Sequence, residues 1–176
     1  MDKEEQENLN KQFIKATENS DLPLIQSLIS QGADIHYNND EALFGACQKS
    51  NLSLMKYLVN KGADIHFSDD YILRFAANNG YLEIVKYLVE KGANIHTQDD
   101  CALRWAINNK KTKIVQYFLF DCEMMIKKAT KDWLLINNYQ ETLNLIEKRD
   151  LLLKLNQDFK NLNNKLIDKK IKKVKI

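Results

Sequence analysis

A five-residue sequence recurs three times along the chain at a fixed interval. Gly-Ala-Asp-Ile-His occupies positions 32–36 and 62–66, and Gly-Ala-Asn-Ile-His occupies 92–96. When segments 63–92 and 93–122 are aligned in this frame, 13 of 30 positions are identical. A constant internal period of this length indicates a chain built from stacked copies of one small structural unit.

Each unit is predicted to contain two short helices. In the central unit, Asp70 is a favourable N-cap for an apolar first helix, and Asn78-Asn79-Gly80 ends that helix. A second helix carries an apolar stripe and ends at Gly92, a left-handed C-cap. Helices of about ten residues are marginal alone in water, so their stripes must be buried against neighbouring units. The columns predicted to form this core are Leu43/Leu73/Leu103, Ala46/Ala76/Ala106 and Tyr57/Tyr87/Tyr117.

The segment 77–95, Ala-Asn-Asn-Gly-Tyr-Leu-Glu-Ile-Val-Lys-Tyr-Leu-Val-Glu-Lys-Gly-Ala-Asn-Ile, resembles the second helix of an ankyrin repeat and the glycine that ends it. The resemblance covers roughly residues 13–122 and implies an all-α solenoid of stacked helix-turn-helix units. The 30-residue variant resembles repeats common in large DNA viruses. Of the Thr-Pro-Leu-His that usually opens the repeat, segments 71–74 and 101–104 keep only the leucine. Three residues are missing before it, so we expect short fingers between units.

The repeat frame and the charge distribution divide the chain into four parts. Residues 1–122 carry a net charge of −4 and residues 123–176 a net charge of +6, an asymmetry that suggests an interacting tail. The predicted parts are an acidic N-terminal segment (1–12), an ankyrin-repeat array (13–122, comprising a partial repeat 13–32 and units 33–62, 63–92 and 93–122), a C-terminal helical cap (123–160) and a Lys-rich tail (161–176).

A heptad stripe follows the repeats, formed by Leu152, Leu155, Phe159, Leu162 and Leu166. Because two heptads are short, we expect this stripe to pack on the chain's own cap and the protein to be a monomer. The alternative is a contact between two chains.

The cysteines and the N-terminus predict an intracellular, cytoplasmic protein, in the host cell if the chain is viral. Cys47, Cys101 and Cys122 lack metal-ligand spacing and read as reduced thiols. The first ten residues are polar and acidic, unlike a signal peptide. No apolar run approaches the roughly 18 residues of a membrane span. The chain also lacks the sequence motifs of common catalytic sites, so we expect no enzyme activity and no cofactor or metal.

The three histidines, His36, His66 and His96, share one column. Stacked units lie roughly 8–10 Å apart, so these rings cannot converge on one metal ion. We expect each ring to bond the finger backbone. In ankyrin proteins the column usually holds Asn and can be an oxygenase hydroxylation site, which is the alternative implied by the resemblance. The pairs Asp69-Asp70 and Asp99-Asp100 are predicted to cap helices and to make the fingers acidic, which would attract a basic ligand.

Two further columns carry large side chains. Arg74 and Arg104 are expected to pair with an Asp of a neighbouring repeat, and the alternative is recognition of an anionic partner. Phe75 and Trp105 are expected in the core, although a partly exposed Trp105 would be an interface anchor.

The leading hypothesis is a non-catalytic interaction module that binds a protein partner of unknown identity on its concave face. The finger tips differ between units while the core columns do not, which fits separate demands on surface and core. The candidate partner-binding residues are Tyr37, Asn38, Asn39, Phe67, Ser68, Asp69, Asn78, Asn79, Thr97, Gln98, Asp99, Asn108 and Asn109.

The alternative function lies in the tail. A basic amphipathic segment binds anionic membranes or nucleic acid phosphates, and the repeats would then be a scaffold. A third hypothesis has the tail fold back and mask the acidic fingers. The tail residues that would make these contacts are Lys165, Lys169, Lys170, Lys172, Lys173 and Lys175.

Overall fold

The computed structural model describes the backbone of residues 2–122 and 124–174, and the same side chains as far as Ile167. Within these residues the regular structure is entirely helical. The chain forms two compact units, Met1–Phe118 and Leu119–Ile176, which we describe separately.

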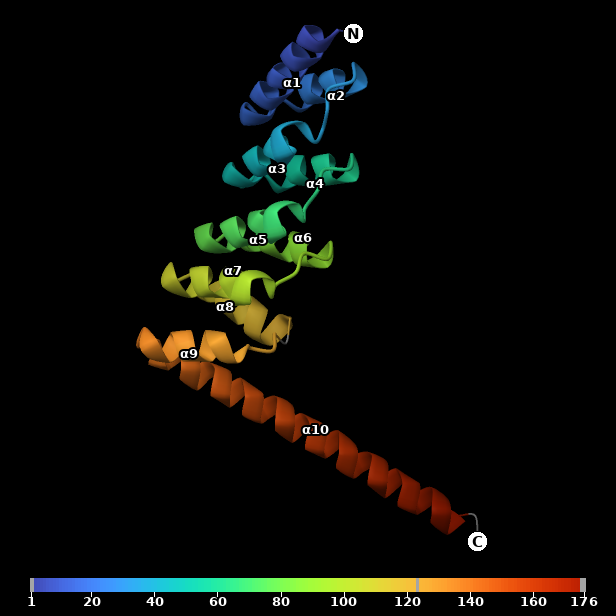
Figure 1. The fold of residues 1–176 in the computed structure, drawn as a ribbon. Coiled ribbons are helices and arrows are strands. Elements are labelled where there is room, and N and C mark those ends of the chain that lie inside the picture. The colour runs from blue at the N-terminus through green and yellow to red at the C-terminus, as the bar shows by residue number, and fades with distance from the viewer. Residues whose placement is uncertain (1, 123, 175–176) are drawn as a thin grey trace. The chain divides into compact units, whose positions relative to one another are not determined.

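The first unit is a stack of helix pairs (Figure 1). The first helices of successive pairs, α1, α3, α5 and α7, pack against one another in order. In the fourth pair the second helix, α8, has only five residues, and a π-helical turn at Tyr117–Asp121 follows it. The helices are α1 Lys3–Glu18, α2 Leu22–Ser30, α3 Tyr37–Gln48, α4 Leu52–Asn60, α5 Phe67–Asn79, α6 Leu82–Glu90, α7 Thr97–Asn108 and α8 Thr112–Gln116.

The repeat columns form the core of this unit. The leucines at 43, 73 and 103 and the alanines at 46, 76 and 106 are fully buried, which confirms both columns. The tyrosine column is less enclosed than predicted, because Tyr87 is buried whereas Tyr57 and Tyr117 are half-buried. Among the cysteines, Cys47 and Cys101 are buried free thiols and Cys122 is a half-buried free thiol.

Helix α1 crosses the expected boundary between the acidic segment and the partial repeat. It begins at Lys3, and Asp2 caps it: the Asp2 carboxylate accepts from the Glu5 backbone N–H over 2.8 Å, and the Asp2 N–H donates to the Glu5 carboxylate over 2.9 Å. Phe13, in the middle of this helix, is fully buried. The acidic residues therefore form the start of the helix that closes the N-terminal end of the stack.

Each finger contains a turn of left-handed backbone. Residues 38–40, 68–70 and 98–100 all have φ between 46° and 63°. L-residues seldom adopt this conformation, and Asn and Asp tolerate it best. Asp40, Asp70 and Asp100 end these turns and are buried, and their carboxylates contact histidine rings. The N-cap positions of these helices are instead His36, His66 and His96, so the predicted capping role of the aspartates is wrong.

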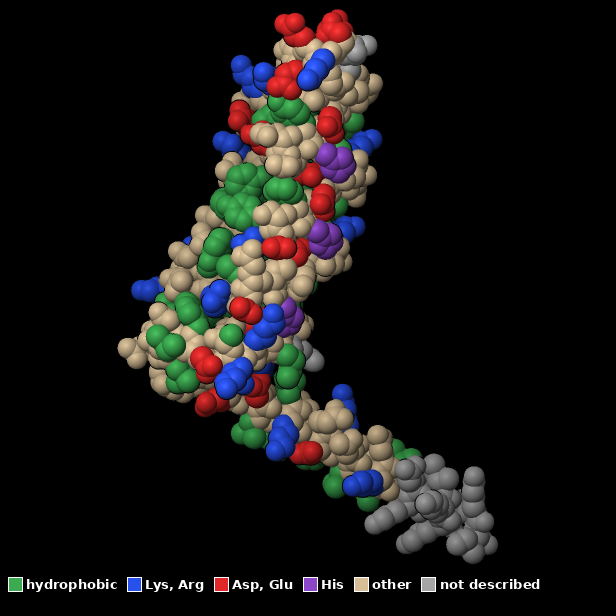
Figure 2. Space-filling view, in the orientation of Figure 1, with side chains coloured by type: hydrophobic (Ala, Val, Ile, Leu, Met, Phe, Trp, Pro, Cys, Tyr) green, Lys and Arg blue, Asp and Glu red, His purple; other side chains and the backbone are tan. Residues whose placement is uncertain are grey.

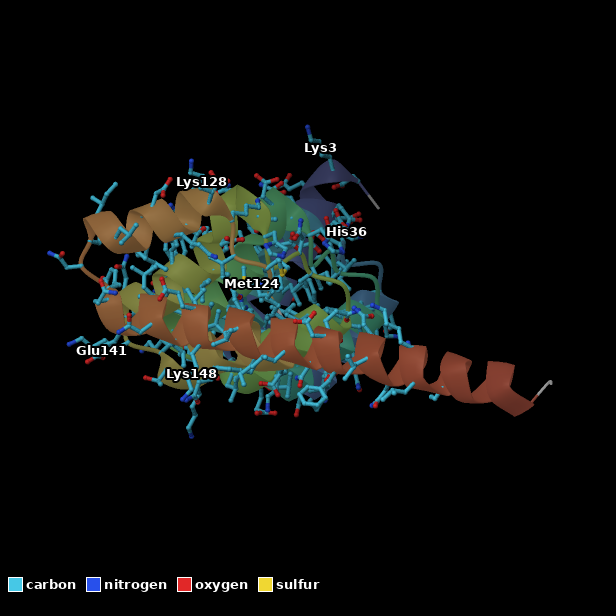
Figure 3. The ribbon with its side chains drawn as sticks, turned by 90° about the horizontal axis from the view of Figure 1, so that it is seen from below. Lys3, His36, Met124, Lys128, Glu141 and Lys148 are labelled. Atoms are coloured by element: carbon cyan, nitrogen blue, oxygen red, sulfur yellow. The ribbon has the colours of Figure 1, made fainter. Side chains whose placement is uncertain are left out.

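The second unit contains α9, Lys128–Ile136, and α10, Gln140–Val174. Helix α9 lies beside the first part of α10, and Lys148 points away from α9 (Figure 3). Leu134, Leu143 and Ile146 are buried between them, and the rings of Trp133 and Tyr139 stack with centroids 5.3 Å apart.

Among the described residues of the second unit, Arg149 is a charged side chain that is buried. It is 3% exposed and donates to the backbone oxygens of Leu119 and Met124, and it pairs with the Asp150 carboxylate. Burial raises the pKa of Asp150, but hydrogen bonds from Arg149 and Lys131 outweigh this effect and leave the pKa below its ordinary value.

Beyond Asp150, α10 is a long exposed helix. It runs without a break across the expected boundary between cap and tail. From Leu151 to Ile167 every side chain except the half-buried Leu153 is exposed, so the prediction that the heptad stripe packs on the chain's own cap is wrong. In the part of the chain that the structure describes, the helices lack the combination of length and apolarity that crosses a membrane.

Candidate functional site

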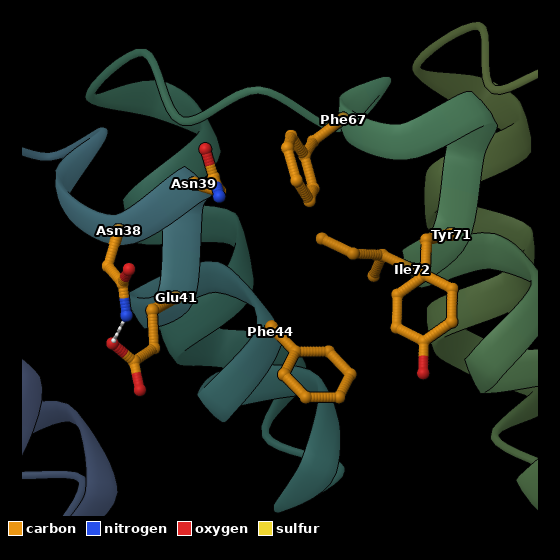
Figure 4. A pocket seen from close by; sticks show the side chains of 7 residues that line it. All are labelled: Asn38, Asn39, Glu41, Phe44, Phe67, Tyr71 and Ile72. Atoms are coloured by element: carbon orange, nitrogen blue, oxygen red, sulfur yellow. Dashed lines mark hydrogen bonds between the residues drawn. The ribbon is translucent and has the colours of Figure 1, made fainter.

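Three neighbouring hollows lie along α1, α3 and α5. The first, of about 290 Å³, lies between the finger of one repeat and that of the next (Figure 4). The aromatic rings of Phe67 and Phe44 face it, and the Ile72 side chain points toward them. Its lining residues are Asn38, Asn39, Glu41, Phe44, Phe67, Tyr71 and Ile72.

Two further hollows extend this one toward the N-terminal helix. One of about 270 Å³ runs between α1 and the first finger, and one of about 110 Å³ lies between α1 and the body of α3. Glu41 lines all three hollows. We call the three together the α3 groove. Its other lining residues are Lys11, Ile14, Lys15, Thr17, Glu18, Tyr37, Gly45 and Gln48.

Half-buried aromatic rings continue along the first helices from the α3 groove. The Phe44 ring lies 5.6 Å from Tyr71 and 4.9 Å from Phe75, centroid to centroid, the second pair edge to face. Trp105 on α7 extends the row. Phe75 and Trp105 are half-buried and not in the core, so that prediction is wrong, and Trp105 has the partial exposure of an interface anchor.

Arg74 joins these rings and the fingers. Its guanidinium lies 5.3 Å from the Tyr71 ring centroid and 5.8 Å from that of Trp105. It donates to the Gln98 side-chain oxygen over 2.9 Å and to the Ser68 backbone oxygen over 2.7 Å. The predicted Asp partner is therefore wrong for Arg74. The guanidinium is buried, which removes it as a free anion-binding group.

The histidines form a column along one edge of the repeats, beside acidic side chains (Figure 2). Their Nδ1 atoms lie 3.1, 2.9 and 2.7 Å from the carboxylates of Asp40, Asp70 and Asp100. The predicted bond from each ring to the backbone is therefore wrong, because the side chain four residues later takes it. Among the described residues, no group of three or more His, Cys, Asp and Glu side chains is arranged to hold a metal ion.

The structure places part of the predicted partner surface in the α3 groove. Asn38, Asn39 and Phe67 line the first hollow, and Tyr37 lines the second. The Tyr37 hydroxyl donates to the Glu7 carboxylate over 2.8 Å. This hydrogen bond raises the pKa of Tyr37 and lowers that of Glu7.

Other predicted residues connect neighbouring repeats. Gln98 donates to Asp69 over 3.2 Å, and Asn109 donates to Asn78 over 2.7 Å. Asn78, Asn79, Asn108 and Asn109 lie at the C-terminal ends of α5 and α7, away from the fingers. Ser68 and Asp99 are exposed, and Thr97 is half-buried.

The tail is described only in part. Lys165 is exposed on α10. The side chains of Lys169, Lys170, Lys172, Lys173 and Lys175 lie outside the described residues.

Sequence reasoning missed Glu41, Phe44 and Tyr71, which line the first hollow. The signal was present in the repeat frame. Glu41 shares a column with Tyr71 and Cys101, and Phe44 shares one with Arg74 and Arg104. Along the first helix, columns whose residue type changes from unit to unit alternate with buried columns that keep the same residue type. The changing columns mark the exposed side of this helix.

Comparison with known proteins agrees with this architecture. The family model described as ankyrin repeats (3 copies) matches residues 13–99 and 43–132, which together cover more than half of the chain. A search of curated proteins found no significant match. The helix pairs, the 30-residue frame and the family match lead to one conclusion: the chain belongs to the ankyrin-repeat family.

Proposed function

We propose that this protein is a non-catalytic adaptor that binds a basic side chain of a partner protein in the first hollow of the α3 groove. Ankyrin repeats generally mediate protein–protein interactions, and the family is typically non-catalytic. The observation that supports this groove is the position of one carboxylate, that of Glu41, among aromatic side chains.

The lining of the first hollow fits a lysine or arginine side chain. Glu41 is the one charged residue among the seven that line it. Phe44 and Phe67 offer apolar surface on which the methylene stem of a long basic side chain packs. Aromatic rings also attract a cation that lies over their faces. The cationic end would then pair with Glu41.

The groove is held in shape before any partner arrives. Asn38 donates to the Glu41 carboxylate over 2.7 Å, and the Phe44 ring packs on Tyr71 and Phe75. Binding therefore orders few side chains on this surface, which lowers the entropic cost of association. Asp69 at the neighbouring finger tip is exposed and adds negative charge near the groove.

The cysteines support a proposed cytoplasmic location. Three free thiols, two of them buried, fit a reducing compartment, and we place the protein in the cytoplasm.

Peptide binding tests this function. An array of short peptides with a central Lys or Arg beside an apolar residue is probed with the full chain and with the variants Glu41→Lys and Phe44→Ala. The matched control is Glu83→Lys, an equal charge change at an exposed position on α6. We expect Glu41→Lys and Phe44→Ala to lose the peptides that the wild type binds, and Glu83→Lys to keep them.

Two results would contradict the proposal. One is equal binding by Glu41→Lys and Glu83→Lys. The other is binding that disappears when residues 161–176 are deleted and falls steeply with salt, which would make the basic tail the binding element.

A further inference from the structure

The exposed part of α10 carries an apolar seam that no described residue covers. Leucine or phenylalanine recurs at spacings of 3, 4, 3 and 4 from Leu152 to Leu166. These side chains are between 46% and 67% exposed. We call this set the α10 seam: Leu152, Leu155, Phe159, Leu162 and Leu166.

A seam of this kind is unusual on a helix that stands in water. Most helical stability in proteins comes from packing of an amphipathic face against other elements rather than from intrinsic helix propensity. The spacing averages 3.5 residues, which keeps a narrow apolar line facing a second helix as the two coil around each other. An interfacial lipid-binding helix carries a broader apolar face, flanked mainly by cationic residues. The α10 seam is narrow in its middle, where it is flanked by Asn156, Asp158, Asn163 and Lys165, only the last of them cationic. The exposed Leu151 and Ile167 widen it at its two ends.

We propose that the α10 seam pairs with the same seam of a second copy of this chain, with the two helices antiparallel. Leu152, Phe159 and Leu166 take the first core position of each heptad, and Leu155 and Leu162 take the fourth. An antiparallel pair centred between Phe159 and Leu162 stacks Phe159 on the second chain's Leu162, and Leu155 on its Leu166. Each of these layers occurs twice, because the contact has two-fold symmetry.

The charges beside the seam decide whether the two helices run parallel or antiparallel. Asp158 and Lys165 are seven residues apart and occupy the same flanking position of successive heptads. In the antiparallel pair this position faces its counterpart, so Asp158 of each chain meets Lys165 of the other. In a parallel pair Lys165 would instead face position 170, also a lysine, and repel it. Among the described residues neither Asp158 nor Lys165 makes an ion pair within its own chain, so both remain available for this contact.

The paired stretch is short but continuous. In this register the apolar layers run from Leu155 to Leu166, 12 residues that span about 18 Å at the 1.5 Å rise of an α-helix, and Leu152 lies just outside them, opposite position 169 of the second chain. A contact of this length makes a reversible dimer. This inference does not depend on the proposed function of the α3 groove.

Sedimentation equilibrium of the full chain over a range of concentrations tests the dimer. We expect a monomer–dimer equilibrium whose heavier species has twice the 20.5 kDa mass of one chain. Asp158→Lys and Lys165→Asp should each weaken dimerisation roughly tenfold, because each replaces two attractive contacts with repulsive ones. The double variant Asp158→Lys/Lys165→Asp should restore it. Gln157→Lys, on the face opposite the seam, is the matched control and should leave the equilibrium unchanged.

Several results would overturn the inference. A chain that stays monomeric at every concentration would do so, and if that monomer co-sediments with phosphatidylglycerol vesicles, the seam binds lipid. A dimer that neither single charge variant weakens would place the contact elsewhere. If the double variant dimerises no more tightly than the single variants, the antiparallel register is excluded. Circular dichroism of each variant confirms that α10 stays helical.

Discussion

Oδ1 of Asp40 accepts a hydrogen bond from the backbone N–H of Asp64, in the next repeat unit, over 2.9 Å. The same oxygen lies 3.1 Å from Nδ1 of His36. One unit earlier, the side-chain oxygen of Asn10 accepts from the backbone N–H of Asp34 over 2.8 Å. A buried side-chain oxygen of one unit thus holds the backbone of the next unit in place.

Removing this acceptor should destabilise the stack. Asp40 is 4% exposed, so Asp40→Ala leaves the Asp64 N–H without its partner and also forces alanine into a left-handed conformation. We expect the free energy of unfolding in urea to fall by about 2–3 kcal/mol. Asp40→Asn keeps an acceptor oxygen and should lose about half as much or less. Equal losses in the two variants would show that the bond to Asp64 contributes little.

Relieving a left-handed residue should have the opposite effect. Ser68 has φ 52°, its side chain is exposed, and only its backbone oxygen receives the bond from Arg74. Glycine adopts this conformation without steric cost, so Ser68→Gly should raise the free energy of unfolding by about 0.5–1 kcal/mol. Ser68→Val, with a branched side chain at positive φ, should lower it. Thermal unfolding followed by circular dichroism measures both changes, and a destabilised Ser68→Gly would refute this account of the turn.

The planar guanidinium of Arg74 should not be replaceable by an amine. Arg74→Lys keeps the charge but cannot donate to Gln98 and Ser68 together from one plane while stacking between two rings. We expect a loss of about 1–2 kcal/mol in unfolding free energy. Lys113 is exposed on α8, so Lys113→Arg serves as a control for exchanging these two residue types at the surface. This substitution should change the free energy of unfolding little. A neutral Arg74→Lys would mean that the charge alone matters.

The burial of the Cys47 thiol should make the protein less stable at high pH. Burial raises the pKa of this thiol to about 12, whereas an unfolded cysteine ionises near pH ~8.5. The stabilising effect is complete below the unfolded pKa and is lost as pH rises from about 8.5 through 12. The wild type should therefore lose about 2 kcal/mol more than Cys47→Ala between pH 8 and pH 10. Urea unfolding of both proteins at the two pH values measures this difference, and parallel losses would contradict it.

The repeat frame was readable from the sequence because burial acts on identical positions in each unit. Leu43, Leu73 and Leu103 occupy equivalent places between stacked helices, so the same side chain suits all three. Gly62, with φ 108°, shows the same constraint on the backbone, since an L-residue with a Cβ would be strained there.

The finger geometry was not readable, because the partner of each side chain, in its own unit or in the next, depends on the folded backbone of the finger. Asp70 looks like a helix cap in isolation, yet its carboxylate lies 2.9 Å from a ring nitrogen of His66. Arg74 was predicted to pair with an Asp of a neighbouring repeat, yet it donates to Gln98 and Ser68 of two different fingers. Local spacing gives residue types but not which neighbour a long side chain will reach.

The position of Glu41 shows a similar gap. Its column holds Glu, Tyr and Cys, which identifies a variable surface position but not a hollow. The hollow depends on how far Phe67 of the next finger reaches across α3, and this distance is set by the stacking of whole units.

The side-chain bonds that join one repeat to the next have a mechanical consequence. The bonds from Asp40 to Asp64, from Arg74 to Gln98 and from Asn109 to Asn78 connect neighbouring units and span 24 to 31 residues. A force applied to the two ends of the array therefore acts on all of these connections in series, and the weakest yields first. Under such tension the repeats should detach singly, each releasing about 30 residues of chain, and the array should yield as a series of small steps rather than in a single rupture.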